Sequence, residues 1–345
     1  MKMKRILIFV TLFAFLLVGC SSGVEATSEN EVKLILGAYT TPREAYGEII
    51  PLFQEFWYSK TGQRVIFEES YLGSGAQSRA VVNGFEADVV ALSLEADVNR
   101  IQEAGLITHD WKQGDYKGIV TTSVVSFVVR EGNPEDVQDW GDLAQNGLEV
   151  LTPNPNTSGG AMWNILALYG AALRGHVEGV PADDPESAAA FLRQVLSNVS
   201  VMDKAARDSI LNFEKGIGDL AITYENEVIV GRQSGQKYEL VLPSSSILIE
   251  NPIALVDESV DKHGAREVAE AFMDFVYSSQ AQTIYAEHGL RVVNPEVAAA
   301  SESQYPAIED LFTVQYFGGW EEIMENIFGE EGVYSRAILQ VQIGE

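Results

Sequence analysis

The segment from Val150 to Gly160 reads VLTPNPNTSGG and carries three local signals in succession. An apolar strand end is followed by a Pro/Asn turn, and two glycines then open a helix predicted over residues 161–173. Since glycine has no side chain, backbone N–H groups at this helix start stay accessible, and the helix dipole adds about half a positive charge. The segment predicts a strand–turn–helix unit whose turn is either an ordinary helix cap or an anion contact.

The composition favours a large acidic binding protein without a metal or cofactor. The chain has 345 residues, 46% of them hydrophobic, a formal charge of -27 and a pI near 4.4. Nucleic-acid binding requires a basic face, so this class is excluded, and local dipoles must hold any anion against the overall field. The four histidines lack the spacing of a metal site; they are His109, His176, His263 and His288.

The N-terminus has the pattern of a secretion signal. Three basic residues precede an apolar run over Ile6–Val18. A membrane-spanning helix needs about twenty apolar residues, so this run fits the core of a signal peptide better. We predict a signal peptide over residues 1–19.

The end of this run resembles a bacterial lipobox. Leu17–Cys20 places small residues before the only cysteine of the chain, which excludes an internal disulfide. We predict a lipid on Cys20, a polar tether over residues 20–31, and an extracytoplasmic protein anchored to a bacterial membrane, on its periplasmic face or at the cell surface.

Strands and helices alternate along the rest of the chain, which predicts an α/β fold of mostly parallel sheets flanked by helices. A chain of this length favours two lobes. We place lobe 1 at residues 32–117 plus 247–345, and lobe 2 at 118–246. Two crossover strands, near Gly118–Val125 and Pro243–Ile247, would form the hinge between them.

Four predicted strand-to-helix turns carry small residues. They are Thr40–Pro42, Gly73–Ala76, Thr157–Gly160 and Asp203–Ala206. In open α/β sheets, ligands bind at the carboxyl ends of strands, where such turns gather. Two turns from each lobe would therefore face one another across a cleft and surround a small dianion with N–H groups.

The chain closely resembles the sulfate-binding protein family, the solute receptors of sulfate/thiosulfate ABC importers. The resemblance extends in consistent order over about residues 32–330, and implies a periplasmic-binding-protein-like fold of type II that closes on its ligand by hinge motion. The matching segments are Tyr39–Glu44, Gly73–Gln77, Gly84–Val90, Gly132–Pro134, Thr152–Ala161, Gly216–Asp219, Tyr224–Glu227 and Phe317–Trp320.

The resemblance also implies a set of sulfate contacts. These are backbone N–H groups, the hydroxyl of Ser74 and the side chain at position 224; the positions are Thr41, Ser74, Gly159, Gly160, Ala206 and Tyr224. Relatives carry Asp at the position of Thr41 and a Trp, whose indole only donates, at that of Tyr224. A phenol donates or accepts, so the identity of the oxyanion is less determined than the fold.

Further polar residues lie near the turns. Ser158 supplies a hydroxyl, and Arg43, Arg79 and Arg207 follow three of the turns. The arginines either reinforce the field around the anion or form salt bridges. Asp203 either has no contact with the ligand or accepts a proton from it, as a carboxylate of a phosphate receptor does.

An enzymatic function fits the sequence less well than a receptor function. Gly73–Gly75 lacks the spacing of a nucleophile elbow, and no histidine lies near any of the motifs. We expect the carboxylates of Tyr224–Glu227 to cap a helix and contact solvent.

We therefore expect a monomeric receptor, not an enzyme, that delivers sulfate, or thiosulfate, to an ABC permease with a cytoplasmic ATPase. The alternatives are a receptor for molybdate, tungstate or phosphate, an extracytoplasmic ester hydrolase, and a lobe that reports to a sensor.

Overall fold

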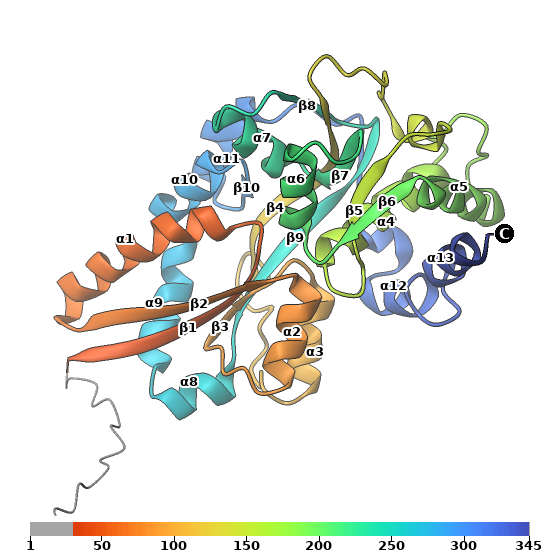
Figure 1. The fold of residues 1–345 in the computed structure, drawn as a ribbon. Coiled ribbons are helices and arrows are strands. Elements are labelled where there is room, and N and C mark those ends of the chain that lie inside the picture. The colour runs from red at the N-terminus through yellow and green to blue at the C-terminus, as the bar shows by residue number, and fades with distance from the viewer. Residues whose placement is uncertain (1–29, 345) are drawn as a thin grey trace, which may run out of the picture.

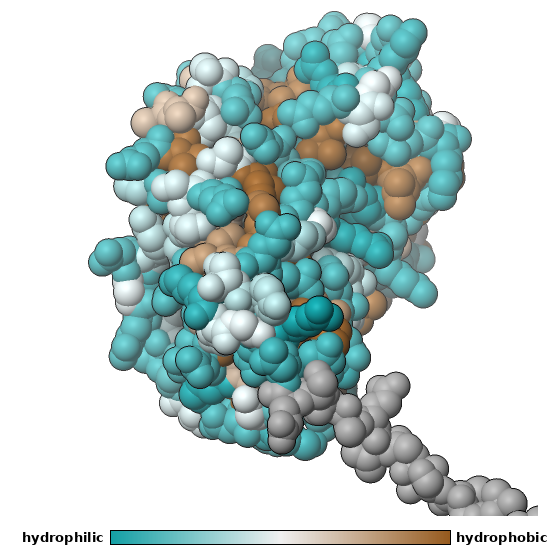
Figure 2. Space-filling model, turned by 90° about the vertical axis from the view of Figure 1, so that its left-hand side faces the viewer, coloured by the Kyte–Doolittle hydropathy of each residue, from teal (hydrophilic) through white to brown (hydrophobic). Residues whose placement is uncertain are grey.

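The computed structural model describes residues 30–344 as two lobes joined by two long strands (Figure 1). The predicted signal peptide and lipid-bearing Cys20 lie outside the described residues. Within them, no helix combines the length and apolar character needed to cross a bilayer. Hydrophilic side chains cover most of the face drawn in Figure 2, and hydrophobic ones gather in recesses between them.

The first lobe is built on three parallel strands with helices on both faces. The strands are β1 (Glu31–Tyr39), β2 (Arg64–Leu72) and β3 (Val89–Ala91), in the order β2-β1-β3. The helices are α1 (Arg43–Thr61), α2 (Ser74–Val82), α3 (Glu95–Glu103), α8 (Asp257–His263), α9 (Arg266–Val276), α10 (Ser279–Glu287) and α11 (Pro295–Ser301).

Helix α1 shows how the sequence forms this lobe. Its buried residues include Ile49, Phe53 and Trp57, spaced by four positions so that they share one face. Phe53 packs against Phe272 of α9, with ring centroids 5.0 Å apart. Gly62 ends the helix with φ 71°, a left-handed conformation in which glycine carries no Cβ penalty.

The second lobe repeats the same plan. Its parallel strands are β5 (Val150–Pro153), β6 (Val199–Asp203) and β7 (Leu220–Tyr224), and β8 (Tyr238–Val241) lies antiparallel to β4. Its helices are α4 (Gly159–Leu173), α5 (Pro185–Ser197), α6 (Ala206–Glu214) and α7 (Glu225–Gln233), with a 3-10 turn at Trp140–Ala144. Helix α4 is buried around nearly its whole circumference and forms the centre of this lobe.

Strands β4 (Ile119–Arg130) and β9 (Ser245–Leu255) connect the lobes. The first part of β4 pairs with β9 and the rest with β7, whereas the end of β9 pairs with β3. The strand order is β2-β1-β3-β9-β4-β7-β5-β6. The sheet is therefore mixed: β1–β3 and β5–β7 are parallel, as predicted, while the pairings of the crossover strands with β3, β7 and each other are antiparallel.

The C-terminal segment departs from the predicted lobe assignment. It contains β10 (Arg291–Val292), β11 (Asp310–Phe312), α12 (Trp320–Asn326), α13 (Val333–Ile343) and 3-10 turns at Glu302–Gln304 and Val314–Phe317. From Phe312 onward its apolar side chains join the core of the second lobe, where Trp320 meets Trp163 at 5.0 Å between ring centroids. Because their apolar side chains are buried against the second lobe, residues 312–343 pack with that lobe, whereas the sequence analysis places 247–345 in lobe 1. The other lobe boundaries stay a prediction.

Candidate anion-binding site

The four predicted turns follow β1, β2, β5 and β6 and meet between the lobes. The N–H of Ala76 in the first lobe donates to the carbonyl of Thr157 in the second, at 3.1 Å. A Cβ on Gly73 would collide with the carbonyl oxygens of Thr157 and Lys204. The lobes are thus closed, with backbone against backbone.

In the wall from the first lobe, Ser74 is held by side chains. Its hydroxyl donates to Asp97 at 2.5 Å and accepts from the N–H of Ser93 at 2.9 Å. Arg100 binds the other oxygen of Asp97 at 2.6 Å. Because the hydroxyl proton is directed to Asp97, the donors that this turn has left for an anion are the N–H groups of Ser74 and Gly75, which open α2 without an intrahelical partner.

In the wall from the second lobe, two glycines leave backbone where side chains would not fit. A Cβ on Gly159 would lie 2.7 Å from Oγ of Ser93, and one on Gly160 would lie 2.9 Å from Cε2 of Tyr224. Ser158 caps α4 and is buried, but its side chain makes no capping hydrogen bond. The first N–H groups of α4 therefore face the other lobe without competition from this side chain.

Tyr224 closes the site from the end of β7. Its hydroxyl lies 2.7 Å from Oγ of Ser93, and either oxygen donates. Burial raises the pKa of Tyr224, so the phenol stays neutral. Ala206, the first residue of α6, contacts the same region, since its Cβ lies 3.1 Å from the position of a Cβ on Gly160.

Ser93 joins the two walls and was missed from sequence. Besides Tyr224 and Ser74, it meets Trp163, whose indole donates to the Ser93 carbonyl at 3.0 Å. Asn251 of crossover strand β9 donates to the same carbonyl at 3.3 Å. The sequence signal available for Ser93 is its position at the end of the largely apolar run over residues 88–93.

Thr41 lies within the turn after β1, and its side chain is buried. Its hydroxyl lies beside the carboxylate of Glu227 without a hydrogen bond of good geometry. The Tyr39 hydroxyl is likewise buried without a hydrogen bond among residues 30–344. Such orphaned groups next to four helix starts are typical of a site that receives a polar ligand.

The three arginines behave differently. Arg207 forms salt bridges, with Nε 3.2 Å from Glu227 and Nη2 2.8 Å from Glu44. Arg43 stacks on a tyrosine ring, its Cζ 5.2 Å from the centroid of Tyr71. Arg79 donates to the carbonyl of Asn156 across the lobes, at 2.6 Å.

The acidic residues after Tyr224 correct the sequence analysis. Glu225 and Glu227 were expected to contact solvent, but both side chains are fully buried. Glu225 pairs with Arg291 at 2.5 Å and Glu227 with Arg207. Burial raises the pKa of Glu227, and the Arg207 guanidinium opposes this effect. The buried pairs cancel charge close to the site.

Asp203, the possible acceptor of a proton from the ligand, uses one of its two carboxylate oxygens in a hydrogen bond with another side chain. Asn212 donates to one carboxylate oxygen of Asp203 at 2.6 Å, while the other oxygen is buried without a partner among the described residues. Across residues 30–344, no group of three or more His, Cys, Asp or Glu side chains is arranged to hold a metal ion.

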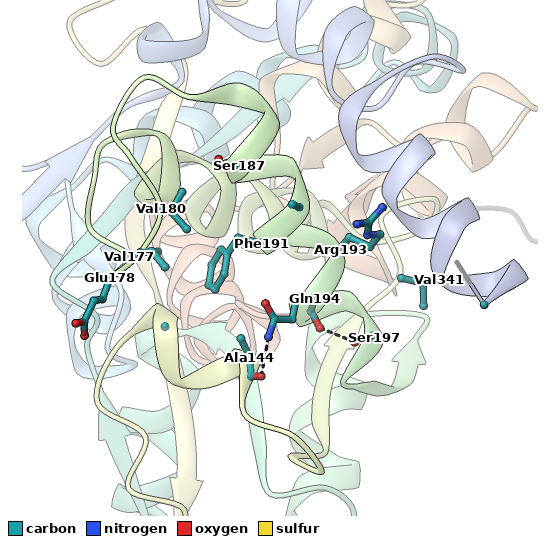
Figure 3. A pocket seen from close by; sticks show the side chains of 14 residues that line it. Ala144, Val177, Glu178, Val180, Ser187, Phe191, Arg193, Gln194, Ser197 and Val341 are labelled. Atoms are coloured by element: carbon teal, nitrogen blue, oxygen red, sulfur yellow. Dashed lines mark hydrogen bonds between the residues drawn. The ribbon is translucent and has the colours of Figure 1, made fainter.

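The cavities locate the mouth of the site. A cavity of about 440 Å³ opens beside the turns and is lined by Thr40, Gly73, Thr157 and Lys204, among others. The largest of the cavities described here, about 810 Å³, lies elsewhere, between α5 and α13, where Phe191 projects into it (Figure 3). Size therefore does not identify the site, since residues of all four turns line the smaller cavity and none of them lines the larger one.

Comparisons with known proteins show the family to which the chain is similar. The family model described as "Bacterial extracellular solute-binding protein" matches residues 34–291. The sulfate-binding protein of Synechocystis is 42% identical over 92% of this chain and 89% of its own. The thiosulfate-binding protein of Pseudomonas aeruginosa is 33% identical over 87% of this chain and 90% of its own.

A solved structure is also similar over most of both chains. The sulfate-binding protein SubI of Mycobacterium tuberculosis has a TM-score of 0.77 and 37% identity, over 85% of this chain and 98% of that chain. Together with the arrangement of strands and helices, these similarities confirm the predicted two-lobe fold class and the resemblance inferred from sequence.

Proposed function

This chain belongs to the sulfate-binding protein family of bacterial extracellular solute-binding proteins, and we propose that it captures sulfate between its lobes and delivers it to an ABC importer. Proteins that are similar over nearly their whole length are named for sulfate or thiosulfate. Thiosulfate, with similar size and charge, is the first alternative ligand.

The observation that carries this proposal is the pair of glycines opposite Ser74. The N–H groups of Gly159, Gly160 and Ser74 open two helices at the closed interface of the lobes, and no Cβ fits at either glycine. Sulfate is fully ionised near neutral pH, so it needs donors and no acceptor. A hydrogen bond to a charged group contributes about 1.5–3 kcal/mol, so five or six of them give about 7.5–18 kcal/mol, a range that includes the roughly 8 kcal/mol of a micromolar complex.

We assign the ligand contacts to Thr41, Ser74, Gly159, Gly160, Ala206 and Tyr224, with Ser158 and the arginines 43, 79 and 207 around them. Ser74 would act through its N–H group, because its hydroxyl serves Asp97. Tyr224 would act either as a donor or by positioning Ser93. The antiparallel strands β4 and β9 would be the hinge on which the lobes open.

We also propose that the mature protein is secreted and anchored to a membrane. Residues 1–19 would be removed as a signal peptide, and a lipid on Cys20 would hold a monomer at the outer face of a bacterial membrane, near its permease. We propose no catalytic activity. The four histidines lie outside the turns, and Asp97, which accepts from the Ser74 hydroxyl, is paired with Arg100, which makes its carboxylate a weaker base.

Calorimetric titration of the mature protein, lacking Cys20 and stripped of ligand, tests the proposal. Sulfate, thiosulfate, phosphate and molybdate are compared at neutral pH. We expect tight binding of sulfate and rejection of phosphate, whose remaining proton would find no acceptor. Binding of molybdate instead would keep the fold and change the ligand, whereas binding of none would refute the receptor function.

A further inference from the structure

The contact between the hydroxyls of Ser93 and Tyr224 leaves one buried proton without an acceptor. The two oxygens lie 2.7 Å apart, and each residue is only 1% exposed. A pair of hydroxyls carries two protons, of which one lies between the two oxygens. Within residues 30–344, neither oxygen has another hydrogen-bond partner. Because an unmet buried donor is costly, the second proton calls for an acceptor that the described residues do not supply.

The backbone of Ser93 is held on both sides, so the place of its hydroxyl is well defined. Its N–H donates to Oγ of Ser74 at 2.9 Å, and its carbonyl accepts from Trp163 at 3.0 Å and from Asn251 at 3.3 Å. Ser93 follows β3 of the first lobe, whereas Trp163 belongs to α4 of the second lobe. The closed arrangement of the two lobes therefore positions this side chain.

The Ser93 hydroxyl lies among three of the contacts that we assign to the anion. Its oxygen is 2.7 Å from the position of a Cβ on Gly159, the first residue of α4. Ser74, whose own N–H opens α2, accepts from the N–H of Ser93, and Tyr224 contacts its hydroxyl. The unpaired proton is thus next to the helix starts of both walls.

The chemistry of the two hydroxyls decides which of them keeps that proton. An aromatic ring withdraws electrons from the phenol oxygen, so a phenol is the stronger donor and an aliphatic hydroxyl the stronger acceptor. Tyr224 therefore donates to Ser93, and the proton of Ser93 is the one left unpaired. Ser74 offers no second hydroxyl donor, because its proton is directed to Asp97.

We propose that Ser93 is a direct contact of the bound oxyanion, with its hydroxyl donating to one ligand oxygen while Tyr224 holds that hydroxyl in place. The inference rests on the proposed function, which supplies the anion. It adds a side-chain donor to a site in which the other donors are chiefly backbone N–H groups. Of the two roles open to Tyr224, it selects the positioning of Ser93.

The experiment is a calorimetric titration of sulfate on the mature protein lacking Cys20 and on three variants. Ser93→Ala keeps the backbone contacts of residue 93 and removes its donor, so sulfate affinity should fall about ten- to hundredfold. Tyr224→Phe should weaken sulfate by about threefold at most, because Ser93 keeps its own proton. Unchanged affinity of Ser93→Ala, or a larger loss for Tyr224→Phe than for Ser93→Ala, would overturn the proposal.

The double variant tests the order of the two hydroxyls. If Tyr224 acts on the ligand through Ser93, then Tyr224→Phe should change sulfate affinity by less than about twofold once Ser93 is alanine. A further loss of about tenfold in the double variant would place the phenol on the ligand and contradict the proposed order.

A buried serine away from the cleft provides the control. The hydroxyl of Ser301 in α11 donates to the carbonyl of Val297 at 2.9 Å. Ser301→Ala should bind sulfate as the parent does, and thermal unfolding without sulfate checks that both serine variants are folded. An equal loss of sulfate affinity in Ser301→Ala would assign the effect to stability and refute the contact at Ser93.

The outcome is separable from that of the proposed function. If the parent protein does not bind sulfate, both proposals fail. If the parent binds sulfate and Ser93→Ala binds it equally well, the receptor function stands and the contact at Ser93 alone is refuted.

Discussion

The two walls of the cleft both contain the start of a helix, but different interactions hold each helix start in place. In the first lobe, Ser74 is fixed by polar contacts to Asp97 and Ser93. In the second lobe, Gly159 and Gly160 are fixed by close packing, with no space for a methyl group. One wall therefore depends on hydrogen bonds and the other on the absence of side-chain atoms. A substitution should weaken the first by removing a hydrogen bond and the second by introducing a steric clash.

The largest effect is expected at the packed wall. Gly159→Ala introduces a Cβ 2.7 Å from Oγ of Ser93 and 2.8 Å from Cγ of Leu94. Overpacking of this kind costs about 1–3 kcal/mol, and we expect the affinity for sulfate in calorimetry to fall about ten- to hundredfold.

A glycine in open space provides the control. Gly47 lies in α1 with no atom within 4 Å of a new Cβ. Gly47→Ala should leave sulfate affinity unchanged and stabilise the helix by about 0.5–1 kcal/mol in thermal unfolding. If Gly159→Ala behaves in the same way, the packed wall does not define the site.

The next effect is expected at the hydrogen-bonded wall. Ser74→Ala removes the donor to Asp97 and the acceptor for the Ser93 N–H, both buried, at a cost of about 1–3 kcal/mol shared between stability and sulfate binding. Chemical unfolding measures the loss of stability, and calorimetric titration measures the loss of sulfate affinity. Ser59→Ala, at an exposed hydroxyl, is the matched control. No loss in either part for Ser74→Ala would show that the hydrogen bonds of its hydroxyl do not hold this wall in place.

A smaller effect is expected where the two walls meet. Tyr224→Phe deletes one hydrogen bond, to Ser93, which contributes about 0.5–1.5 kcal/mol. A loss of sulfate affinity with unchanged stability indicates that the phenol donates to the ligand, and the reverse indicates a positioning role. Tyr58→Phe, at a half-exposed ring, should change neither. If Tyr224→Phe also changes neither, the phenol has no part in the closed site.

The smallest effect is expected outside the two walls, at His263 of the first lobe, which lies between Asp88 and Glu86. Burial lowers the pKa of His263, but hydrogen bonds to Asp88 and Glu86 outweigh it and raise the pKa above its ordinary value of 6.5. The protonated form is thus favoured by folding, so its contribution is complete below pH 6.5 and is lost as pH rises through the raised pKa.

Thermal unfolding followed from pH 5.5 upward, starting below the ordinary histidine pKa of 6.5, should therefore show a slight fall in stability as the pH rises. The pKa of Asp88 is also raised, chiefly by burial, so its ionisation changes stability in the same direction as that of His263. His263→Gln should flatten the fall. An identical slope in the variant would assign the pH dependence to other groups.

Much of the fold was accessible from the sequence because its signals are local. Residues 32–38 form an apolar run and residues 42–61 have helical apolar periodicity with a glycine after it, and β1 and α1 lie at these positions. The glycine turns were equally visible, because an anion-binding helix start needs small residues at adjacent positions.

What the sequence could not reveal depends on contacts between distant residues. Glu225 looks solvent-exposed in its local context, yet Arg291, 66 residues further on, buries it. Helices α12 and α13 are short, and long-range contacts, such as those of Trp320 with Trp163 and of Gln340 with Arg193, show which lobe they join. Ser93 gains its role from partners in four separate segments, none of which its own neighbours indicate.

The central claim is that backbone N–H groups hold the anion, and amide NMR of the ¹⁵N-labelled mature protein tests it most directly. On addition of sulfate, the account predicts that the amide resonances of Ser74, Gly159, Gly160 and Ala206 shift and gain protection from exchange, while that of Gly47 stays unchanged. Sulfate binding in calorimetry without any change at these four amides would contradict the account.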